Sequence, residues 1–222
     1  MIPEQPFKKL RHAMVAEQIE SRHLKDPALL NAMRAIPRHR FVPPEYQEAA
    51  YEDRPLLIGE NQTISQPYIV ALMTNLLQLR GEETVLEVGT GSGYQAAILA
   101  ALSKQVYTIE RHPSLAQRAQ TILKELGIQN VSVLQGDGSC GWPEQAPYDA
   151  IMVTAAAPKI PEPLLEQLRV GGRLVLPVGG LGVQSLETWE RTKSGYQHET
   201  VVPVAFVPLR GRYGFEEDWY HK

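Results

Sequence analysis

The sequence predicts an α/β protein built on a doubly wound, mostly parallel sheet. The first observation is the buried-strand pattern Thr84–Val88, which runs into a glycine-rich turn and an alanine-rich helical stretch. The second is the alternation of strand and helix patterns that follows, which is typical of parallel sheets. The third is a pair of alternating stretches around the turn Lys193-Ser194-Gly195, which predicts a closing antiparallel hairpin. The 222 residues suffice for one domain that buries roughly 70% of its unfolded surface.

Composition narrows the classes of function. The single cysteine, Cys140, excludes an intramolecular disulfide, leaves no cysteine cluster for a metal and fits a reducing compartment. No apolar run approaches the roughly 20 residues of a membrane span. The net charge of −3 gives no basic footprint for a polyanion. We therefore expect a cytoplasmic protein without a metal, a membrane anchor or a nucleic-acid partner. We also expect a monomer, although composition does not determine the oligomeric state.

Two amphipathic helices are predicted before the sheet. Apolar residues share one broad face of the segment Phe7 to Leu24. A second helix begins with Asp26 as its N-cap and Pro27 at its first position, and Pro37 ends it. We interpret the basic run that follows, Arg-His-Arg at 38–40, as a solvated turn, with an anion site as the alternative.

A third helix is predicted between Pro67 and Gly81. Ser65 stands just before its first turn, where a serine commonly caps a helix by accepting a backbone hydrogen bond. Spacing alone favours this capping role over a functional one. Residues 1–80 are expected to form N-terminal helices and a segment that covers the substrate and cofactor.

The turn after the first strand predicts a nucleotide pocket. Gly89, Gly91 and Gly93 lack the β-carbons that would keep a ligand away from the backbone, and they permit positive φ angles. A dinucleotide fingerprint needs its third glycine one residue later, where this chain has Tyr94. The pattern E-x-G-x-G-x-G instead resembles motif I of the Rossmann-like methyltransferases, whose loop surrounds the methionine part of S-adenosylmethionine. Glu87 suits the sulfonium and ammonium charges of that ligand, and a turn that binds nothing is the alternative.

Acidic residues follow the next two strands. Glu110 closes the strand Gln105–Glu110, about 20 residues after the glycines, where an acid can accept hydrogen bonds from a ribose diol. A surface carboxylate is the alternative. Asp137 and Gly138 follow the strand Val131–Gln135, where a carboxylate and backbone N–H groups can pair with an adenine. A simple Asp-Gly turn is the alternative there.

The rest of the sheet favours one kind of methyl acceptor. The fourth strand, Asp149 to Thr154, runs into Ala155-Ala156-Ala157-Pro158. Many enzymes that methylate nitrogen place an Asn or Asp here to hold the amine, whereas this chain has only small apolar side chains. That absence favours an oxygen that is already anionic. The remaining predicted elements are the helices Gln95–Leu102, Pro113–Leu126 and Pro163–Leu168, the strand Arg173–Val178, and the hairpin strands Gln184–Thr192 and Gln197–Val207.

Four stretches together resemble the protein-L-isoaspartate O-methyltransferase family. They are residues 61–67 (Asn-Gln-Thr-Ile-Ser-Gln-Pro), 85–94, 136–138 (Gly-Asp-Gly) and 154–158 (Thr-Ala-Ala-Ala-Pro) continued at 177–179. The first and the last are specific to this family, whereas the other two indicate a methyltransferase of this fold. The similarity runs from about Met14 to Leu209.

The resemblance implies a class I methyltransferase fold in which the last two strands exchange their order. It implies an enzyme that uses S-adenosyl-L-methionine without a metal and methylates the free α-carboxylate of L-isoaspartyl residues in damaged proteins and peptides. Ser65 falls on the family's active-site serine, which hydrogen-bonds the acceptor carboxylate. Motif I and the family pattern together give these candidate cofactor residues: Gln62, Thr63, Ile64, Ser65, Glu87, Gly89, Gly91, Gly93, Glu110, Asp137 and Gly138.

Three other functions are compatible with the glycine loop. One is a methyltransferase for RNA or a small molecule, the second is a protein that binds S-adenosylmethionine without catalysis, and the third is a nicotinamide oxidoreductase, against which Tyr94 argues. We interpret the chain as one domain. It comprises a covering segment at 1–80, the cofactor-binding sheet at 81–210 and a tail at 211–222 without an assigned role.

Overall fold

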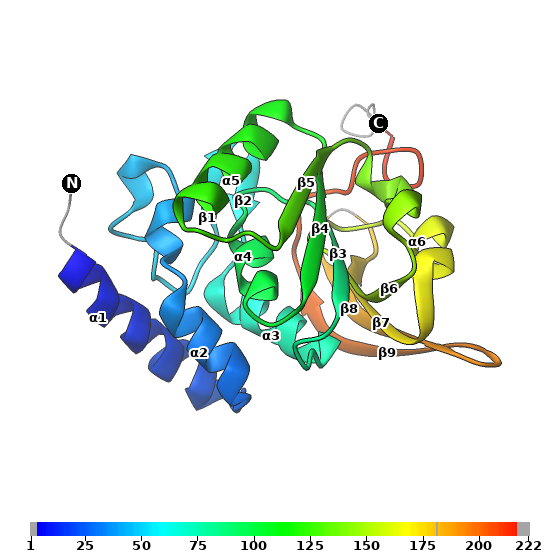
Figure 1. Ribbon diagram of the computed structural model, residues 1–222, viewed down its shortest axis with the longest axis horizontal. Coiled ribbons are helices and arrows are strands. Elements are labelled where there is room, and N and C mark those ends of the chain that lie inside the picture. Colours follow the sequence, from blue (N-terminus) through cyan, green and yellow to red (C-terminus); the bar gives the residue numbers. More distant parts are fainter. Residues whose placement is uncertain (1–3, 181, 217–222) are drawn as a thin grey trace.

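The computed structural model describes residues 4–180 and 182–216 and contains a seven-stranded sheet (Figure 1). In chain order its strands are β3 (Thr84–Val88), β4 (Gln105–Glu110), β5 (Val131–Gln135), β6 (Tyr148–Val153), β7 (Leu168–Val178), β8 (Gln184–Thr192) and β9 (Gly195–Val204). The spatial order is β5-β4-β3-β6-β7-β8-β9. The first five of these are parallel, and β8 and β9 run antiparallel. The predicted doubly wound sheet with a C-terminal antiparallel hairpin is confirmed.

Helices cover both faces of this sheet (Figure 1). They are α3 (Pro67–Leu77), α4 (Tyr94–Ala100), α5 (Pro113–Glu125) and α6 (Glu162–Gln167). Because side chains alternate along a strand, Val85 belongs to the core under α3, α4 and α5, whereas Leu86 belongs to the core that includes Leu164 of α6. Both strand residues are fully buried. The chain winds outward from β3 in both directions, so a crevice is expected at the carboxyl end of β3.

The sheet differs from the prediction at β7. The strand begins at Leu168 rather than at Arg173, because Leu168 pairs with Tyr148 before the register shifts. Beyond β7, the hairpin strands β8 and β9 follow in chain order, which agrees with the exchanged order that the resemblance implies. No helix among the described residues has both the length and the apolar character of a membrane span.

The N-terminal segment packs beside α3 and α4. It contains α1 (Glu4–Met14), a π-helical turn at Val15–Ile19, and α2 (Pro27–Ala35). Asp26 caps α2 as predicted, since its carboxylate accepts a hydrogen bond from the backbone N–H of Ala28 at 2.9 Å. The first helix, predicted over Phe7 to Leu24, is α-helical only as far as Met14, because the π-helical turn follows it.

The basic run at 38–40 is not a solvated turn. It forms a 3₁₀ helix, η3 (Arg38–Phe41), in which Arg38 is fully buried and His39 is nearly so. The His39 ring stacks on Phe7 at 4.0 Å between centroids, and its Nδ1 lies 2.8 Å from the Tyr51 hydroxyl. The interpretation as a solvated turn is thus wrong for two of the three residues, because tertiary packing recruits them.

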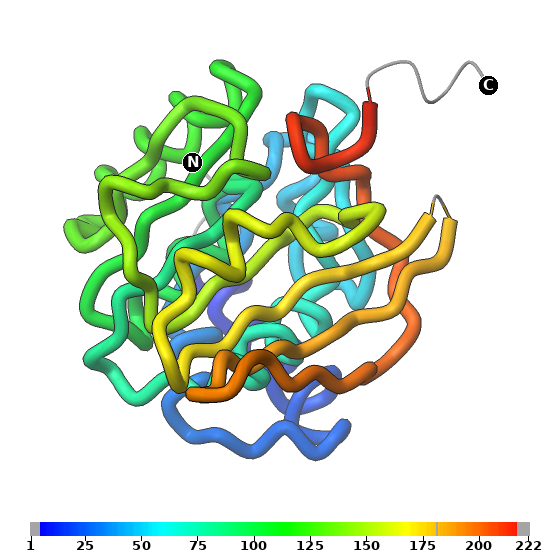
Figure 2. Tube along the Cα trace, turned by 90° about the vertical axis from the view of Figure 1, so that its right-hand side faces the viewer, coloured from blue at the N-terminus to red at the C-terminus, as the bar shows by residue number. Residues whose placement is uncertain are grey.

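Two short segments that no pattern predicted form a small sheet of their own. The strands β1 (Leu56–Gly59) and β2 (Gln62–Ile64) pair antiparallel through a turn at Glu60 and Asn61, both with positive φ. At the other end of the chain, the segment after β9 returns across the carboxyl edge of the sheet (Figure 2). There it is joined to the strand-β6 loop by backbone bonds, from Ala156 N to Val207 O at 2.8 Å and from Leu209 N to Ala156 O at 2.7 Å.

Candidate functional site

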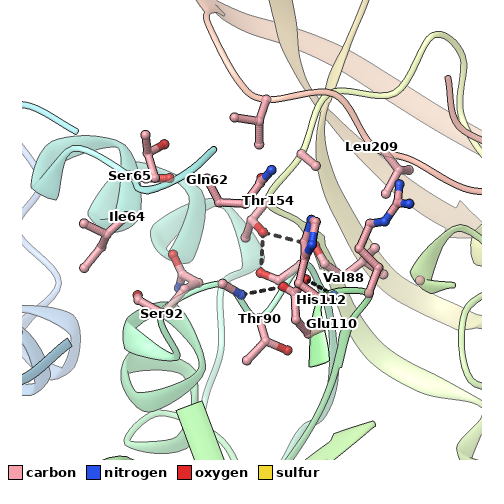
Figure 3. A pocket seen from close by; sticks show the side chains of 18 of the residues that line it. Gln62, Ile64, Ser65, Val88, Thr90, Ser92, Glu110, His112, Thr154 and Leu209 are labelled. Atoms are coloured by element: carbon pink, nitrogen blue, oxygen red, sulfur yellow. Dashed lines mark hydrogen bonds between the residues drawn. The ribbon is translucent and has the colours of Figure 1, made fainter. Parts of the chain in front are cut away.

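A cavity of roughly 910 Å³, counting the part open to solvent, lies at the carboxyl ends of β3, β4 and β6. Its wall is formed by residues 62–65, 88–92, 94–95, 109–112, 154–155 and 207–210, together with Gly138 and two residues of α3. Figure 3 shows Ile64 and Ser65 on one side of the cavity and Glu110, His112 and Leu209 on the other. The location is the one at which doubly wound sheets bind their ligands.

The glycine loop supplies one wall. Gly89 and Gly91 line the cavity, and Gly89 adopts φ +97°, which an L side chain rarely adopts. A β-carbon at Gly89 would also lie 2.4 Å from Thr154 Oγ1. Gly93 does not line the cavity, because it starts α4 with φ +86° and its missing β-carbon leaves room for Ala119 of α5. Gly93 therefore serves the close packing of two helices.

Glu110 is fixed beside this loop by two backbone groups. Its Oε2 accepts a hydrogen bond from Gly91 N at 2.8 Å and its Oε1 accepts one from His112 N at 2.9 Å. Both bonds are drawn in Figure 3. Glu110 is 5% exposed and lines the cavity, so its carboxylate is held in one orientation at the carboxyl edge of the sheet. This geometry suits an acid that accepts hydrogen bonds from a diol.

Glu87 lies beneath the loop rather than in the cavity wall. It is fully buried, and its Oε2 accepts a hydrogen bond from the Thr108 hydroxyl at 2.6 Å. Burial raises the pKa of Glu87 to about 8, against the opposing effect of that hydrogen bond and with a smaller contribution from the charge of Glu110. Its Oε1 has no hydrogen-bond partner within the described residues. The glycine loop therefore separates Glu87 from a cofactor in the cavity, so Glu87 can interact with the cofactor's charge only across this loop.

Both carboxylate oxygens of Asp137 accept hydrogen bonds from other groups of the protein. Its Oδ1 accepts hydrogen bonds from Ser139 N at 2.9 Å and the Ser139 hydroxyl at 2.7 Å, and its Oδ2 accepts one from Arg212 N at 2.8 Å. These bonds hold the pKa of Asp137 below its usual value although partial burial opposes them. Asp137 does not line the cavity, whereas Gly138 does, and a β-carbon on Gly138 would lie 2.6 Å from Val88. Asp137 thus holds the start of the tail against the loop that carries Gly138.

The segment from Gln62 to Ser65 forms the opposite wall, because all four of its residues line the cavity. The β1–β2 turn is fastened to α5, since Ser114 donates a hydrogen bond to Glu60 at 2.6 Å. The N-cap of α3 is Gln66, so the prediction that Ser65 caps this helix is wrong. The half-buried Ser65 hydroxyl donates to none of the residues that the structure describes, which leaves it available to a ligand.

Sequence reasoning missed several residues of the wall. Ser92 and Gln95 lie on the loop and on α4, and Arg111 and His112 follow β4 directly. Their position next to motif residues was the available signal. Residues 207–210 carried no signal of this kind, because they reach the site through pairing with the β6 loop, more than 50 residues away in the chain.

The residues present fit S-adenosylmethionine. The wall combines side-chain-free backbone at Gly89, Gly91 and Gly138 with one oriented carboxylate, Glu110, and apolar residues of α3. A concave site that mixes apolar walls with polar groups pointing inward is typical of small-molecule sites. Within the described part of the chain, no group of three or more His, Cys, Asp or Glu side chains could hold a metal ion.

Comparisons with known proteins agree with this geometry. The model of the protein-L-isoaspartate(D-aspartate) O-methyltransferase family matches residues 9–214. A protein-L-isoaspartate O-methyltransferase of Methanoregula boonei is 55% identical over 206 residues, which cover 93% of this chain and 95% of the relative. "Protein-L-isoaspartate O-methyltransferase 1" of Syntrophobacter fumaroxidans is 53% identical over 210 residues, covering 95% and 98%.

Solved structures give the same result. One protein-L-isoaspartate O-methyltransferase superposes with a TM-score of 0.84 at 28% identity, covering 92% of this chain and 67% of the other. A second, from Plasmodium falciparum, is described as a putative enzyme of this kind in complex with S-adenosyl-L-homocysteine. It gives a TM-score of 0.79 at 26% identity, with 90% and 98% covered. The chain therefore belongs to the protein-L-isoaspartate(D-aspartate) O-methyltransferase family.

Proposed function

We propose that this chain carries out its family's reaction, methyl transfer from S-adenosylmethionine to the free α-carboxylate of an L-isoaspartyl residue, with Ser65 as the ligand of that carboxylate. The observation that carries the proposal is the Ser65 hydroxyl, which lines the cavity opposite the glycine loop and neither caps α3 nor bonds another described residue. Ser65 is thus in a position to donate a hydrogen bond to an anion in the cavity.

A carboxylate acceptor needs little chemical help from the protein. An α-carboxyl group has a reference pKa of about 3.5, so it is ionised near neutral pH and requires no general base. S-adenosylmethionine, when bound, supplies a methyl group that its sulfonium charge already activates. The task left to the chain is to hold the acceptor in line and to exclude water, which can supply on the order of 7 to 11 kcal/mol.

The wall of the cavity supports an anionic acceptor. Arg111, His112 and Arg210 line it together, whereas Glu110 is engaged by two backbone N–H groups. Beside Thr154, the small side chain of Ala155 completes the wall where an amine-binding group would stand in many nitrogen methyltransferases. We assign the cofactor contacts to the other candidate residues that line the cavity, and Ser65 to the acceptor: Gln62, Thr63, Ile64, Gly89, Gly91, Glu110 and Gly138.

We further propose that the enzyme acts as a cytoplasmic monomer on isoaspartyl proteins and peptides, without a nucleic-acid partner. The net charge of −3 supports the absence of a nucleic-acid partner, and the single cysteine supports the cytoplasm. Light scattering coupled to gel filtration tests the monomer, and a mass of twice 24.8 kDa would contradict it.

The variant Ser65→Ala tests the role of Ser65. A hydrogen bond to a charged group contributes about 1.5–3 kcal/mol, so kcat/KM for a synthetic isoaspartyl peptide should fall roughly 10- to 100-fold. Affinity for S-adenosylhomocysteine, measured by calorimetry, should stay within about twofold of the parent value. Ser194→Ala, at the exposed β8–β9 turn, is the matched control and should change neither quantity.

Two outcomes would contradict the proposal. Equal losses of cofactor affinity and turnover in Ser65→Ala would assign Ser65 to the structure of the β2–α3 connection. Transfer of methyl to the normal aspartyl isomer of the same peptide, at the same rate as to the isoaspartyl form, would contradict the assigned substrate.

A further inference from the structure

A buried arginine joins the two walls of the cavity. Arg38, in η3, has no exposed surface, and its guanidinium reaches three separate segments of the chain. Its Nη2 donates a hydrogen bond to the backbone carbonyl of Ser65 at 2.7 Å. Its Nε donates one to the carbonyl of Ala50 at 2.7 Å. Its central carbon lies 5.0 Å from the centre of the Tyr94 ring.

These three contacts have different relations to the site. Ser65 and Tyr94 both line the cavity, one from the β2–α3 connection and the other from the first position of α4. Ala50 is fully buried in the turn between η4 (Pro44–Tyr46) and β1. The guanidinium therefore ties the peptide that bears Ser65 to the helix that continues the glycine loop. We propose that Arg38 is a positioning residue that sets the location of the Ser65 hydroxyl relative to the glycine loop; this inference rests on the proposed role of Ser65.

Burying the charged guanidinium of Arg38 carries a desolvation penalty. No carboxylate is hydrogen-bonded to it, and its Nη1 has no partner within residues 4–180 and 182–216. Burial accordingly lowers the pKa of Arg38 to about 10. An apolar side chain of similar volume would avoid this desolvation penalty. An apolar side chain, however, lacks the planar guanidinium that donates to two carbonyl groups and contacts a ring face at the same time.

The hydrogen bond to Ser65 acts on the residue's own peptide. Neighbouring residues are held separately, because Ile64 pairs with Leu56 in the small sheet and the Gln66 side chain donates to Asp53 O at 3.2 Å. Without Arg38, the peptide between these two attachments is free to rotate, and the hydroxyl moves with it. A displacement of about 1 Å can lower turnover by roughly 100-fold.

The test compares Arg38→Lys with Arg11→Lys. Lysine at 38 keeps the charge but cannot make both carbonyl bonds and the ring contact. Arg11 is a second buried arginine of the N-terminal segment, 6% exposed, whose Nε donates to Arg34 O at 2.7 Å and which does not line the cavity. The comparison thus separates the general cost of losing a buried guanidinium from an effect on Ser65.

Steady-state methylation of a synthetic isoaspartyl peptide is measured at saturating S-adenosylmethionine, and rates are expressed per calorimetric binding site for S-adenosylhomocysteine. We expect kcat/KM of Arg38→Lys to fall roughly 10- to 100-fold, the affinity for S-adenosylhomocysteine to stay within about threefold, and Arg11→Lys to keep the parent's kcat/KM. Equal kcat/KM values in the two variants would overturn the proposal. Loss of S-adenosylhomocysteine binding in Arg38→Lys would also overturn it, because Arg38 would then support the fold as a whole.

The double variant Ser65→Ala/Arg38→Lys separates this inference from the role of Ser65. If Arg38 acts through Ser65, the lysine substitution should lower kcat/KM by less than about threefold once the hydroxyl is gone. A full and independent loss in that background would overturn the positioning role. A Ser65→Ala enzyme with the parent's turnover would instead remove the proposed role of Ser65, and with it the basis of this inference.

Discussion

The substitution Gly89→Ala tests why the first glycine of the loop carries no side chain. Gly89 has a φ of +97°, and a β-carbon built there lies 2.4 Å from Thr154 Oγ1 and 3.7 Å from Thr154 Cβ. The same Thr154 hydroxyl donates a hydrogen bond to Gly89 O at 2.6 Å. Alanine therefore imposes a strained backbone angle and also displaces the hydroxyl from its acceptor.

The two effects can be separated by their magnitudes. Strain at a positive φ costs about 1–3 kcal/mol, and the lost hydrogen bond costs about 1 kcal/mol. Gly89→Ala should thus lower the free energy of unfolding by about 2–4 kcal/mol. Thr154→Ala loses only the hydrogen bonding of the hydroxyl, which is shared between Gly89 O and, at 3.1 Å, Val88 O, and it leaves its β-carbon at an ordinary contact distance. Each single variant loses the bond, but the double variant loses it only once. The destabilisation of the double variant should therefore be about 1 kcal/mol smaller than the sum of the two single destabilisations.

Urea unfolding of the parent, both single variants and the double variant measures this coupling. Gly81→Ala is the matched control, because Gly81 has a φ of +104° and nothing within 4 Å of its missing β-carbon. Alanine at 81 should cost only the strain, about 1–3 kcal/mol, and this cost should be the same with and without Thr154→Ala. Additive costs for Gly89→Ala and Thr154→Ala would refute the contact on which the argument depends.

Two further predictions concern the acids that do not line the cavity. Because burial raises the pKa of Glu87 from 4.5 to about 8, the folded chain binds more protons than the unfolded chain between these values, so stability falls as pH rises. Glu87→Gln lacks this titration, so its free energy of unfolding minus that of the parent should increase by up to about 1.4 kcal/mol per pH unit across pH 5–8. A difference in urea unfolding that does not depend on pH would contradict this prediction. Asp137 is the N-cap of the 3₁₀ turn Gly138–Cys140 and also accepts the hydrogen bond from Arg212 N. Asp137→Ala should therefore release residues 211–216 from this turn and cost about 1–3 kcal/mol. Trypsin should then cleave faster at Arg212, while Asp26→Ala, which removes another N-cap, should leave that cleavage unchanged.

The central sheet could be predicted because its patterns are local. The strands Gln105–Glu110 and Val131–Gln135 have the predicted bounds, since short runs rich in apolar and β-branched residues end at polar or glycine residues on both sides. The helix from Pro113 also begins where proline can occupy the first position. In such segments the residues that define an element lie next to one another in the chain, so no tertiary knowledge is needed.

The N-terminal segment shows where local patterns fail. The short strands β1 and β2 contain four and three residues, too few for a periodicity to be recognised. The run at 38–40 appears polar in the sequence, yet Arg38 is buried by contacts with Ala50, Ser65 and Tyr94, which lie 12 to 56 residues further along. A charged side chain is expected at the surface unless its partners are known.

The candidate site was predicted at the level of motifs, and the structure separates two kinds of motif residue. Gly89, Gly91 and Glu110 line the cavity, whereas Glu87 and Asp137 support the loops from behind and Gly93 allows α4 to pack closely on α5. Sequence spacing cannot distinguish these two groups, because a residue beneath a loop and a residue on its surface occupy neighbouring positions. Their roles toward the cofactor stay predictions.

The cavity is assembled from every part of the chain, which argues for a single functional unit. Ser65 comes from the segment at 1–80, the glycine loop from the sheet, and residues 207–210 from the end of the chain, where Arg212 is bonded to Asp137. The boundary near residue 80 therefore separates two structural regions but passes through the site. Because Arg38 and Glu60 both connect the N-terminal segment to elements beyond this boundary, we infer that the sheet expressed without residues 1–80 would lack one wall of the cavity and the proposed ligand of the acceptor.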